Sequence, residues 1–454
     1  MSSITFTPIG GGTDIGANCY LLEKGDSGVI LDAGIHPKKE GREALPEFSL
    51  LKKAPDAVLI SHGHIDHCGS LPFLMREFPA TASYATRPTV SIIDRMLHNS
   101  VSVMTTLGRE RNISDYPLYS HSDVDFAIRQ TSGMPYDKEF ALTWNSPFRA
   151  SFQHTGHVLG SAGIVIRAED HTIFYTGDIC LTDQELMKGL QPLDSSVKID
   201  TLVIESTRGA HLDDEQRTFT SEIRRFTEEV RKVLENGGVV LVPAFALGRT
   251  QELLNIIDRL INTGELPTVP VYASGLGRAI YEVYDKFNDF LKPEVSLSPL
   301  YQFKRIGDVW DPRISRKLLK QPSIIVATSG MMIENTPSAM IAQEMVKEDK
   351  HAIFFVGYLD PDTLGYKLLN AELGEPLRFE LEGQDVQVNL PNRQTFHFSA
   401  HAPREDLVHV VRQTQPRNVV FIHGEEDAID WLKDACDGVA NRFAPDIGET
   451  ITLD

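Results

Sequence analysis

Four side chains of metal-binding type lie within six residues of the chain, in the sequence HGHIDH: His62, His64, Asp66 and His67. An apolar stretch at 57–60 precedes them directly, so the end of a strand would hold this loop in place. An isolated His-x-His pair is often only a solvated turn. Four ligands at this spacing instead predict that one short loop presents imidazole and carboxylate groups to two adjacent divalent ions.

A hydrolytic metal site also needs ligands from other parts of the chain and an open position for water. His157 in HTGHVLGSAG, Asp178 in FYTGDIC and Asp32 in VILDAG each follow an apolar stretch typical of a strand. Sites in α/β folds gather at the carboxyl ends of strands. We therefore expect these three residues to join the histidine loop.

The elements that position these residues fall into two patterns. Up to about residue 205, short apolar stretches separated by glycine turns predict strands with interspersed helices. Beyond it, helical spacing over 213–235, an apolar stretch at 239–242 and a second helical pattern at 249–261 predict a parallel sheet flanked by helices. The first pattern returns near residue 396. We expect an α/β domain interrupted by a second α/β domain.

Composition narrows the class of protein. The chain has 454 residues, of which 41% are apolar, so it can bury a sizeable core and is not a disordered protein. No apolar run approaches the roughly 20 residues needed to cross a bilayer, and the start has no secretory signal, so we expect no membrane partner. Four scattered cysteines indicate neither a disulfide framework nor a thiolate zinc site and favour the cytoplasm. The net charge of −19 disfavours a dedicated non-specific nucleic-acid binder.

Eight short motifs carry a resemblance to a known family. LDAG, HGHIDH, HTGHVLGSA and YTGD, in this order, resemble the metallo-β-lactamase superfamily. IESTRGA, VPAFALGRTQELL, FSAHAPRED and FIHGEE resemble its β-CASP subgroup of nucleic-acid hydrolases, which includes ribonuclease J and cleavage and polyadenylation-type endonucleases. The resemblance implies a four-layer αβ/βα metallo-β-lactamase fold over 1–205 and 395–454, with an α/β β-CASP domain inserted at 206–394.

The resemblance also assigns roles to residues. It implies two Zn²⁺ ions per chain, with Mn²⁺ as the alternative, and it implies that Asp66 is both ligand and catalytic residue. Asp32 would orient the ligands, and Asp178 would bridge the ions. The remaining ligands would be divided between the first ion, with His62, His64 and His157, and the second, with Asp66, His67 and His423.

The activity implied is hydrolysis of phosphodiesters in single-stranded RNA, by an endonuclease or 5′-exonuclease. Two metals would activate a hydroxide, His401 would act as general acid, and Glu205 would orient its imidazole. A histidine at position 423 favours RNA over DNA within the family. Arg249, at a predicted helix start, and Ser399 are candidate phosphate ligands.

Two segments depart from the family's pattern. Ile333-Glu334-Asn335 stand where relatives carry glycines, and Tyr366-Lys367 stand where many carry an arginine, so the part of the inserted domain that would grip substrate is altered. Two alternatives stay open at this stage. One is a metallohydrolase of a small anionic ester or thioester, and the other is a non-catalytic β-CASP scaffold subunit. A homodimer or a partner protein is compatible with either. The histidines at 211, 351 and 409 are expected at the surface.

Overall fold

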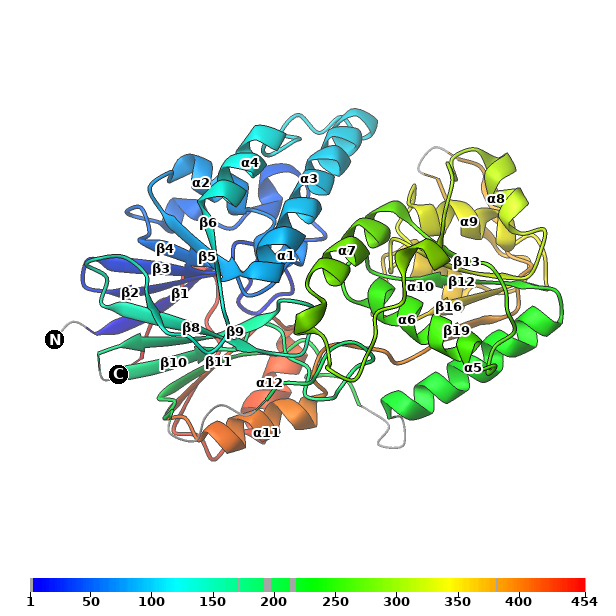
Figure 1. Cartoon of the computed structure of the whole chain (residues 1–454). Helices are drawn as coiled ribbons and strands as arrows, with labels where there is room; N and C mark the ends of the chain where they lie inside the picture. Colours follow the sequence, from blue (N-terminus) through cyan, green and yellow to red (C-terminus); the bar gives the residue numbers. More distant parts are fainter. Residues whose placement is uncertain (1–2, 170, 192–196, 213–217, 381–382, 454) are drawn as a thin grey trace. The chain divides into compact units, whose positions relative to one another are not determined.

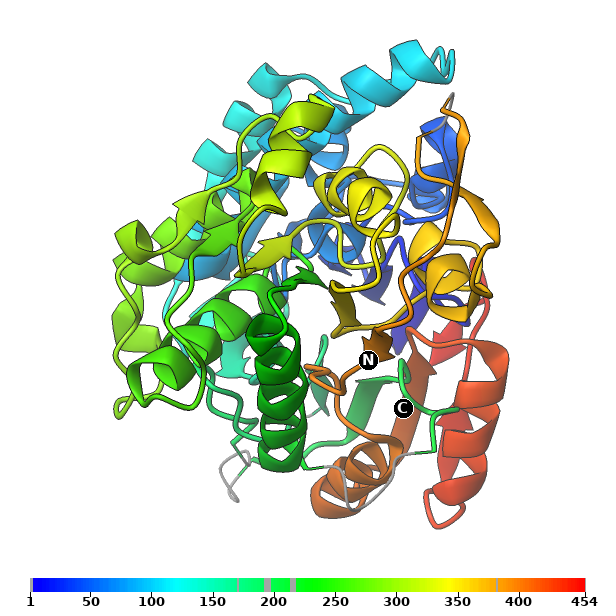
Figure 2. The same cartoon turned by 90° about the vertical axis from the view of Figure 1, so that its right-hand side faces the viewer.

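The computed structural model describes residues 3–169, 171–191, 197–212, 218–380 and 383–453. They form two compact units (Figures 1 and 2). The first unit takes in 1–183, 187–212 and 400–454, and the second unit takes in 213–399 together with three residues, Gln184–Leu186, which we call the strap. We expected domain changes at 206 and 395. The chain changes units at 212/213 and 399/400, and the strap is an additional exchange that local sequence patterns did not indicate.

Two seven-stranded sheets form the centre of the first unit. The first sheet consists, in spatial order, of β22 (Ile451–Thr452), β1 (Ile4–Gly10), β2 (Cys19–Lys24), β3 (Ser27–Leu31), β4 (Ala57–Leu59), β5 (Ala82–Thr86) and β6 (Thr131–Met134). The second consists of β21 (Asn441–Phe443), β20 (Asn418–Ile422), β11 (Thr201–Glu205), β10 (His171–Tyr175), β9 (Ala162–Ala168), β8 (Phe148–His154) and β7 (Phe140–Ala141).

Helices cover the outer face of each sheet, as Figure 1 shows. The first sheet is covered by α1 (Ile65–Cys68), α2 (Leu71–Glu77), α3 (Arg87–Glu110) and α4 (His121–Gln130). The second is covered by α11 (Arg404–Thr414) and α12 (Glu426–Ala435). Between the sheets, side chains such as Phe6 and Tyr20 pack against Phe152 and Ile164. The order helix, sheet, sheet, helix confirms the predicted four-layer fold.

The second unit is a three-layer α/β unit. Its six strands pair in parallel in the order β14 (Lys304–Arg305), β13 (Val271–Ala273), β15 (Ser323–Ala327), β12 (Val239–Pro243), β16 (Ala352–Phe355) and β19 (Arg393–Thr395). Alternate residues of β12 face opposite layers. Val240 packs toward α5 (Phe219–Glu235), α6 (Arg249–Asn262) and α7 (Gly275–Lys286), whereas Leu241 packs toward α8 (Pro312–Leu318), α9 (Pro337–Met345) and α10 (Leu364–Asn370).

Smaller elements complete the chain. A hairpin of β17 (Pro376–Arg378) and β18 (Asp385–Gln387) belongs to the second unit, and single 3₁₀ turns lie at Gly41–Ala44, Phe48–Leu50, Asn288–Phe290 and Leu300–Gln302. The helix expected over 213–235 begins at Phe219, with the Thr218 hydroxyl accepting from the Ser221 N–H. The first five residues of that expected helix, 213–217, lie outside the described residues. In the part of the chain that the structure describes, no helix is both long and apolar enough to span a membrane.

Candidate metal centre

The predicted metal ligands all follow the ends of strands in the first unit. The HGHIDH loop follows β4, and Asp32 directly follows the parallel neighbour β3. In the second sheet, Asp178 and His423 follow β10 and β20, while Glu205 is the last residue of β11, which lies between those two strands. Asp32 and His423 have positive φ of 60° and 51°, an uncommon backbone conformation that concentrates at functional sites.

The first group of ligands contains three imidazoles and one carboxylate. His64 Nδ1 lies 3.0 Å from His62 Nε2 and 3.1 Å from His157 Nε2. Asp178 Oδ2 lies 3.4 Å from His62 Nε2 and 3.5 Å from His157 Nε2. These four donor atoms therefore converge on one point.

The second group contains Asp66, His67 and His423. The Nε2 atoms of His67 and His423 lie 3.1 Å apart, and each lies 3.6 Å from Asp66 Oδ2. The other oxygen of Asp178, Oδ1, lies 3.4 Å from both of these nitrogens. One carboxylate thus faces both groups with different oxygens, which is the arrangement expected of a residue that bridges two ions.

The chemistry of this donor set fits bound cations. Burial, reinforced by the neighbouring imidazoles, lowers the pKa of His62 and His67 well below the usual range, so both rings are neutral, the form that coordinates metals. Burial and the nearby charges of Glu205 and Asp66 raise the pKa of Asp178, and its Oδ1 is buried without a hydrogen-bond partner. A cation there would satisfy that oxygen and balance the buried negative charge.

Asp32 forms a hydrogen bond with the ring nitrogen of His67 that does not face the other ligands. Its Oδ2 accepts from His67 Nδ1 at 2.7 Å and from the hydroxyls of Ser61, at 2.7 Å, and Tyr175, while Oδ1 accepts from the Ser61 N–H at 2.6 Å. Burial is the main reason that the pKa of Asp32 rises to about 7. Donation from Nδ1 fixes the tautomer of His67 and leaves its Nε2 lone pair for a metal. The structure thus places Asp32 where an orienting residue would be needed.

Sequence reasoning missed Ser61, Tyr175 and Asn18. The Asn18 side-chain nitrogen donates to the Asp66 carbonyl at 3.1 Å and lies 3.1 Å from His67 Nε2, and its Oδ1 accepts from Tyr20. Ser61 directly precedes the histidine loop, which was the available signal. Tyr175 lies in β10, and packing of the second sheet against the first brings its hydroxyl to Asp32. Asn18 directly precedes β2, and no local pattern marked the role of either residue.

His401 and Glu205 form a hydrogen-bonded pair next to the ligands. His401 Nδ1 donates to Glu205 Oε2 at 3.0 Å and lies 3.9 Å from Asp178 Oδ2. Glu205 is buried, and its Oε1 accepts from the Ile179 N–H at 2.6 Å. Burial opposes ionisation, but His401 and these hydrogen bonds lower the pKa of Glu205, so the carboxylate stays charged. The imidazole of His401 is 24% exposed and can reach a substrate.

The expected phosphate ligands lie in the second unit. Arg249 begins α6, but its guanidinium is buried and donates to Gln184 of the strap. The N–H groups of residues 248, 249, 250 and 252 already donate within this loop and helix start. Ser399 is half-buried. Phosphate binding by either residue stays a prediction.

The altered segments also belong to the second unit. Met332 and Asn335 have positive φ of 50° and 60°, so this loop takes up left-handed backbone conformations without glycines there. Tyr366 and Lys367 lie in α10, with the Tyr366 side chain partly exposed.

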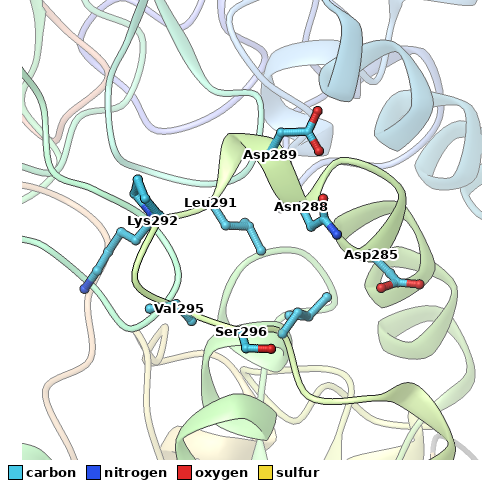
Figure 3. A pocket seen from close by; sticks show the side chains of 9 residues that line it. Asp285, Asn288, Asp289, Leu291, Lys292, Val295 and Ser296 are labelled. Carbon is cyan, nitrogen blue, oxygen red and sulfur yellow. The ribbon is translucent and has the colours of Figure 1, made fainter.

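A separate hollow of about 450 Å³ lies in the second unit, between α7 and residue 297 (Figure 3). Figure 3 shows Leu291 near its middle and the Asp289 carboxylate pointing away from it. Lys292 also lines the hollow, but its ammonium points away from it and donates to the Gln184 carbonyl at 2.8 Å. None of the predicted site residues lines this hollow, so it is not a candidate for the hydrolytic site.

This fold, together with seven converging side chains of metal-binding type, defines the class of metal-dependent hydrolases, and comparison with known proteins identifies the family. Residues 12–244 match the metallo-β-lactamase superfamily, 250–368 match the β-CASP domain, and 385–442 match the Zn-dependent metallo-hydrolase RNA specificity domain. The chain belongs to the metallo-β-lactamase superfamily, with a β-CASP domain.

Similar proteins include curated relatives of nearly the same length and longer ones. The chain is 31% identical to an RNase J-like protein of Methanocaldococcus jannaschii, over 92% of this chain and 91% of the relative. It is 31% identical to cleavage and polyadenylation specificity factor 73 of Drosophila melanogaster, covering 94% of this chain and 60% of that protein. It is 28% identical to Integrator complex subunit 11 of Danio rerio, covering 100% and 75%. A structure of an Enterococcus faecalis V583 protein of unknown function shares the fold, with 15% identity, a TM-score of 0.58, and coverage of 99% of this chain and 100% of that one.

Proposed function

We propose that the protein is a metal-dependent ribonuclease that hydrolyses phosphodiester bonds in single-stranded RNA. The observation that carries this proposal is the convergence of both ligand groups beside the His401–Glu205 pair. The match of residues 385–442 to an RNA specificity domain, and the relatives named for RNA processing, support RNA as the substrate.

The protein's own residues would perform the following work. His62, His64 and His157 would hold one ion, Asp66, His67 and His423 would hold the second, and Asp178 would be shared. When bound, two divalent ions supply positive charge that lowers the pKa of water and screens the phosphoryl oxygens. We expect Zn²⁺ in both positions, with Mn²⁺ as the alternative.

His401 would supply the proton that the departing oxygen needs. Because Nδ1 is engaged with Glu205, Nε2 is the atom that would carry and donate this proton. The buried carboxylate of Glu205 would stabilise the protonated ring. Asp32 would keep His67 in its ligating tautomer throughout.

Neither alternative is favoured over a ribonuclease. A scaffold subunit would not need all seven ligands in convergent positions, yet they are present. A small ester substrate would not account for the RNA specificity match. The four cysteines are buried, and work in a reducing compartment such as the cytoplasm stays a prediction. A homodimer or a partner protein stays a prediction as well.

The test is cleavage of labelled single-stranded RNA and DNA by metal-quantified protein, with His64→Ala and the exposed His409→Ala as a matched pair. We expect RNA cleavage by the parent and by His409→Ala, and loss of bound metal and activity in His64→Ala. End-labelled RNA separates endonuclease from 5′-exonuclease products. Activity on a bis-nitrophenyl phosphodiester without any RNA cleavage would contradict the proposal.

A further inference from the structure

Residues 301–320 of the second unit, which we call the basic segment, carry a charge opposite to that of the whole chain. The segment contains six basic and two acidic residues in a protein of net charge −19. All six basic side chains are exposed: Lys304, Arg305, Arg313, Arg316, Lys317 and Lys320. An exposed group of cations on an otherwise acidic protein calls for a specific anionic partner.

The fold of the segment explains why its charges face solvent. Phe303, Ile306 and Val309 are buried at three-residue spacing, which leaves the side chains between them outside. The chain then enters α8, where Leu318 packs into the same core as Ile306 and Val309. A Cβ added to Gly307 would lie 3.2 Å from Ile314 Cγ2, so the residue after Ile306 and helix α8 are in close contact. The residues that follow edge strand β14 therefore pack against α8.

Several of these cations have no carboxylate partner within the part of the chain that the structure describes. Arg313 pairs with Asp311 at 2.8 Å and Arg316 pairs with Glu344 at 3.0 Å. Among the described residues, no ion pair engages Lys304, Arg305, Lys317 or Lys320. The Lys304 ammonium lies 5.8 Å from the centre of the Tyr272 ring, but within the described residues no carboxylate neutralises any of these four cations, so they can bind phosphates.

The segment also exposes two large aromatic rings. Tyr301 is 84% exposed and Trp310 is 56% exposed, and they flank the exposed Lys304-Arg305 pair of edge strand β14. Exposed aromatic side chains next to exposed cations are features that bind single-stranded nucleic acid, because bases stack on the rings and the cations bind the backbone phosphates. An acidic protein partner would use the cations but would not need both rings.

We propose that the basic segment is a second contact surface for single-stranded RNA. Tyr301 and Trp310 stack bases, and Lys304 and Arg305 bind the adjoining phosphates. This inference rests on the proposed ribonuclease function, because it assigns to the same substrate a surface formed by residues other than the metal ligands and the His401–Glu205 pair.

The test measures affinity separately from cleavage. A labelled single-stranded RNA is titrated with full-length protein carrying His401→Ala, so that RNA stays intact, and fluorescence anisotropy is recorded at several salt concentrations. In this background, Trp310→Ala is compared with Trp144→Ala, which removes a 97% exposed tryptophan of the first unit. The double variant Lys304→Gln/Arg305→Gln is compared with Lys52→Gln/Lys53→Gln, an exposed basic pair of the first unit.

We expect Trp310→Ala to weaken binding at least about five-fold, and Trp144→Ala to leave it unchanged. The Lys304/Arg305 variant should reduce the slope of log affinity against log salt by about 1.4, since each phosphate contact to a single strand contributes about 0.7. The same variants without His401→Ala should hydrolyse bis-nitrophenyl phosphodiester at the parental rate, which shows that the fold and metal centre are intact.

The proposal would be overturned if the Trp310→Ala and Lys304→Gln/Arg305→Gln variants both bound RNA as tightly as the protein that carries His401→Ala alone. It would also be overturned by equal losses in the Trp144 and Lys52/Lys53 controls, or by a change in oligomeric state with unchanged RNA affinity, which would assign the surface to a second copy. Cleavage of RNA by the protein with a native His401 is scored in parallel. If cleavage occurs while the variants bind normally, only this inference fails, and if cleavage does not occur, the ribonuclease function fails.

Discussion

Removing the imidazole of His401 should have different effects on two substrates that differ in their need for an acid. RNA releases an alkoxide, which must be protonated as it departs, whereas bis-nitrophenyl phosphodiester releases a stable nitrophenolate. His401 is held at 3.0 Å by Glu205 and is exposed enough to meet a leaving group. It lies in neither of the two ligand groups described above, although with Glu205 and Asp178 it forms a third group of metal-binding type, so metal content must be measured in the variant.

A positioned general acid contributes about 10²–10⁴-fold to a rate. We therefore expect His401→Ala to lower RNA cleavage by that factor and to lower hydrolysis of the nitrophenyl ester less than about ten-fold. Glu205→Gln keeps the shape but removes the charge that supports the protonated ring. A charged hydrogen bond is worth about 1.5–3 kcal/mol, so a loss of about 10–100-fold on RNA is expected.

The assay is steady-state cleavage of both substrates with metal content measured on the same samples. His409→Ala, an exposed histidine of α11, is the matched control. An equal fall on both substrates with metal retained would refute the role of His401 as acid. Parental RNA cleavage by His401→Ala would refute it more directly.

Three further changes have expected outcomes. Asp32→Asn disrupts the support of His67 and should weaken metal binding about 10–100-fold, measured by metal retention against graded chelator, with exposed Asp26→Asn as control. Burial raises the pKa of Glu222, but Arg225 and the hydrogen bond from the His397 N–H lower it by more, so the pKa of Glu222 lies below its ordinary value. A carboxyl group whose pKa is lowered in the folded protein stabilises the fold at a pH above its unfolded-state pKa of 4.5, and this stabilisation is lost as the pH falls through its folded-state pKa. Glu222→Gln should therefore make the melting temperature fall less steeply with pH in this acidic range. Phe226→Ala should cost about 3–5 kcal/mol in chemical denaturation, because its ring is fully buried among other aromatics of the second unit.

Most of the metal centre could be predicted because its ligands follow strand ends. Each of those strands is short and either apolar or alternating, and the HGHIDH loop gathers four candidate ligands, so local sequence indicated where a metal could bind. His423 and the division of the ligands between two ions came only from the resemblance to the family. The support of Asp32 by Tyr175 depends on the packing of two different sheets, which no local pattern encodes.

Two residues show where local patterns were wrong or incomplete. His351 was expected at the surface, but it is buried, and its Nδ1 accepts from the Val239 N–H at 3.1 Å at the beginning of β12. Arg249 was correctly predicted at the start of a helix. Its guanidinium, however, donates to Gln184 of the strap, which the sequence pattern around Arg249 did not indicate. In both cases the environment is formed by residues distant in sequence.

The strap has a consequence for anyone who would excise or transplant the inserted domain. Two interactions hold its three residues in the second unit: the Glu185 carboxylate forms an ion pair with Arg259 at 2.7 Å, and the Leu186 N–H donates to the Glu252 carboxylate at 2.9 Å. A gene fragment encoding 213–399 alone would lack these partners and would leave the buried Arg249 cation without Gln184. The inserted domain is therefore incomplete as a single fragment: a viable graft must carry a second, non-contiguous peptide, or replace the polar side chains whose partners the strap supplies.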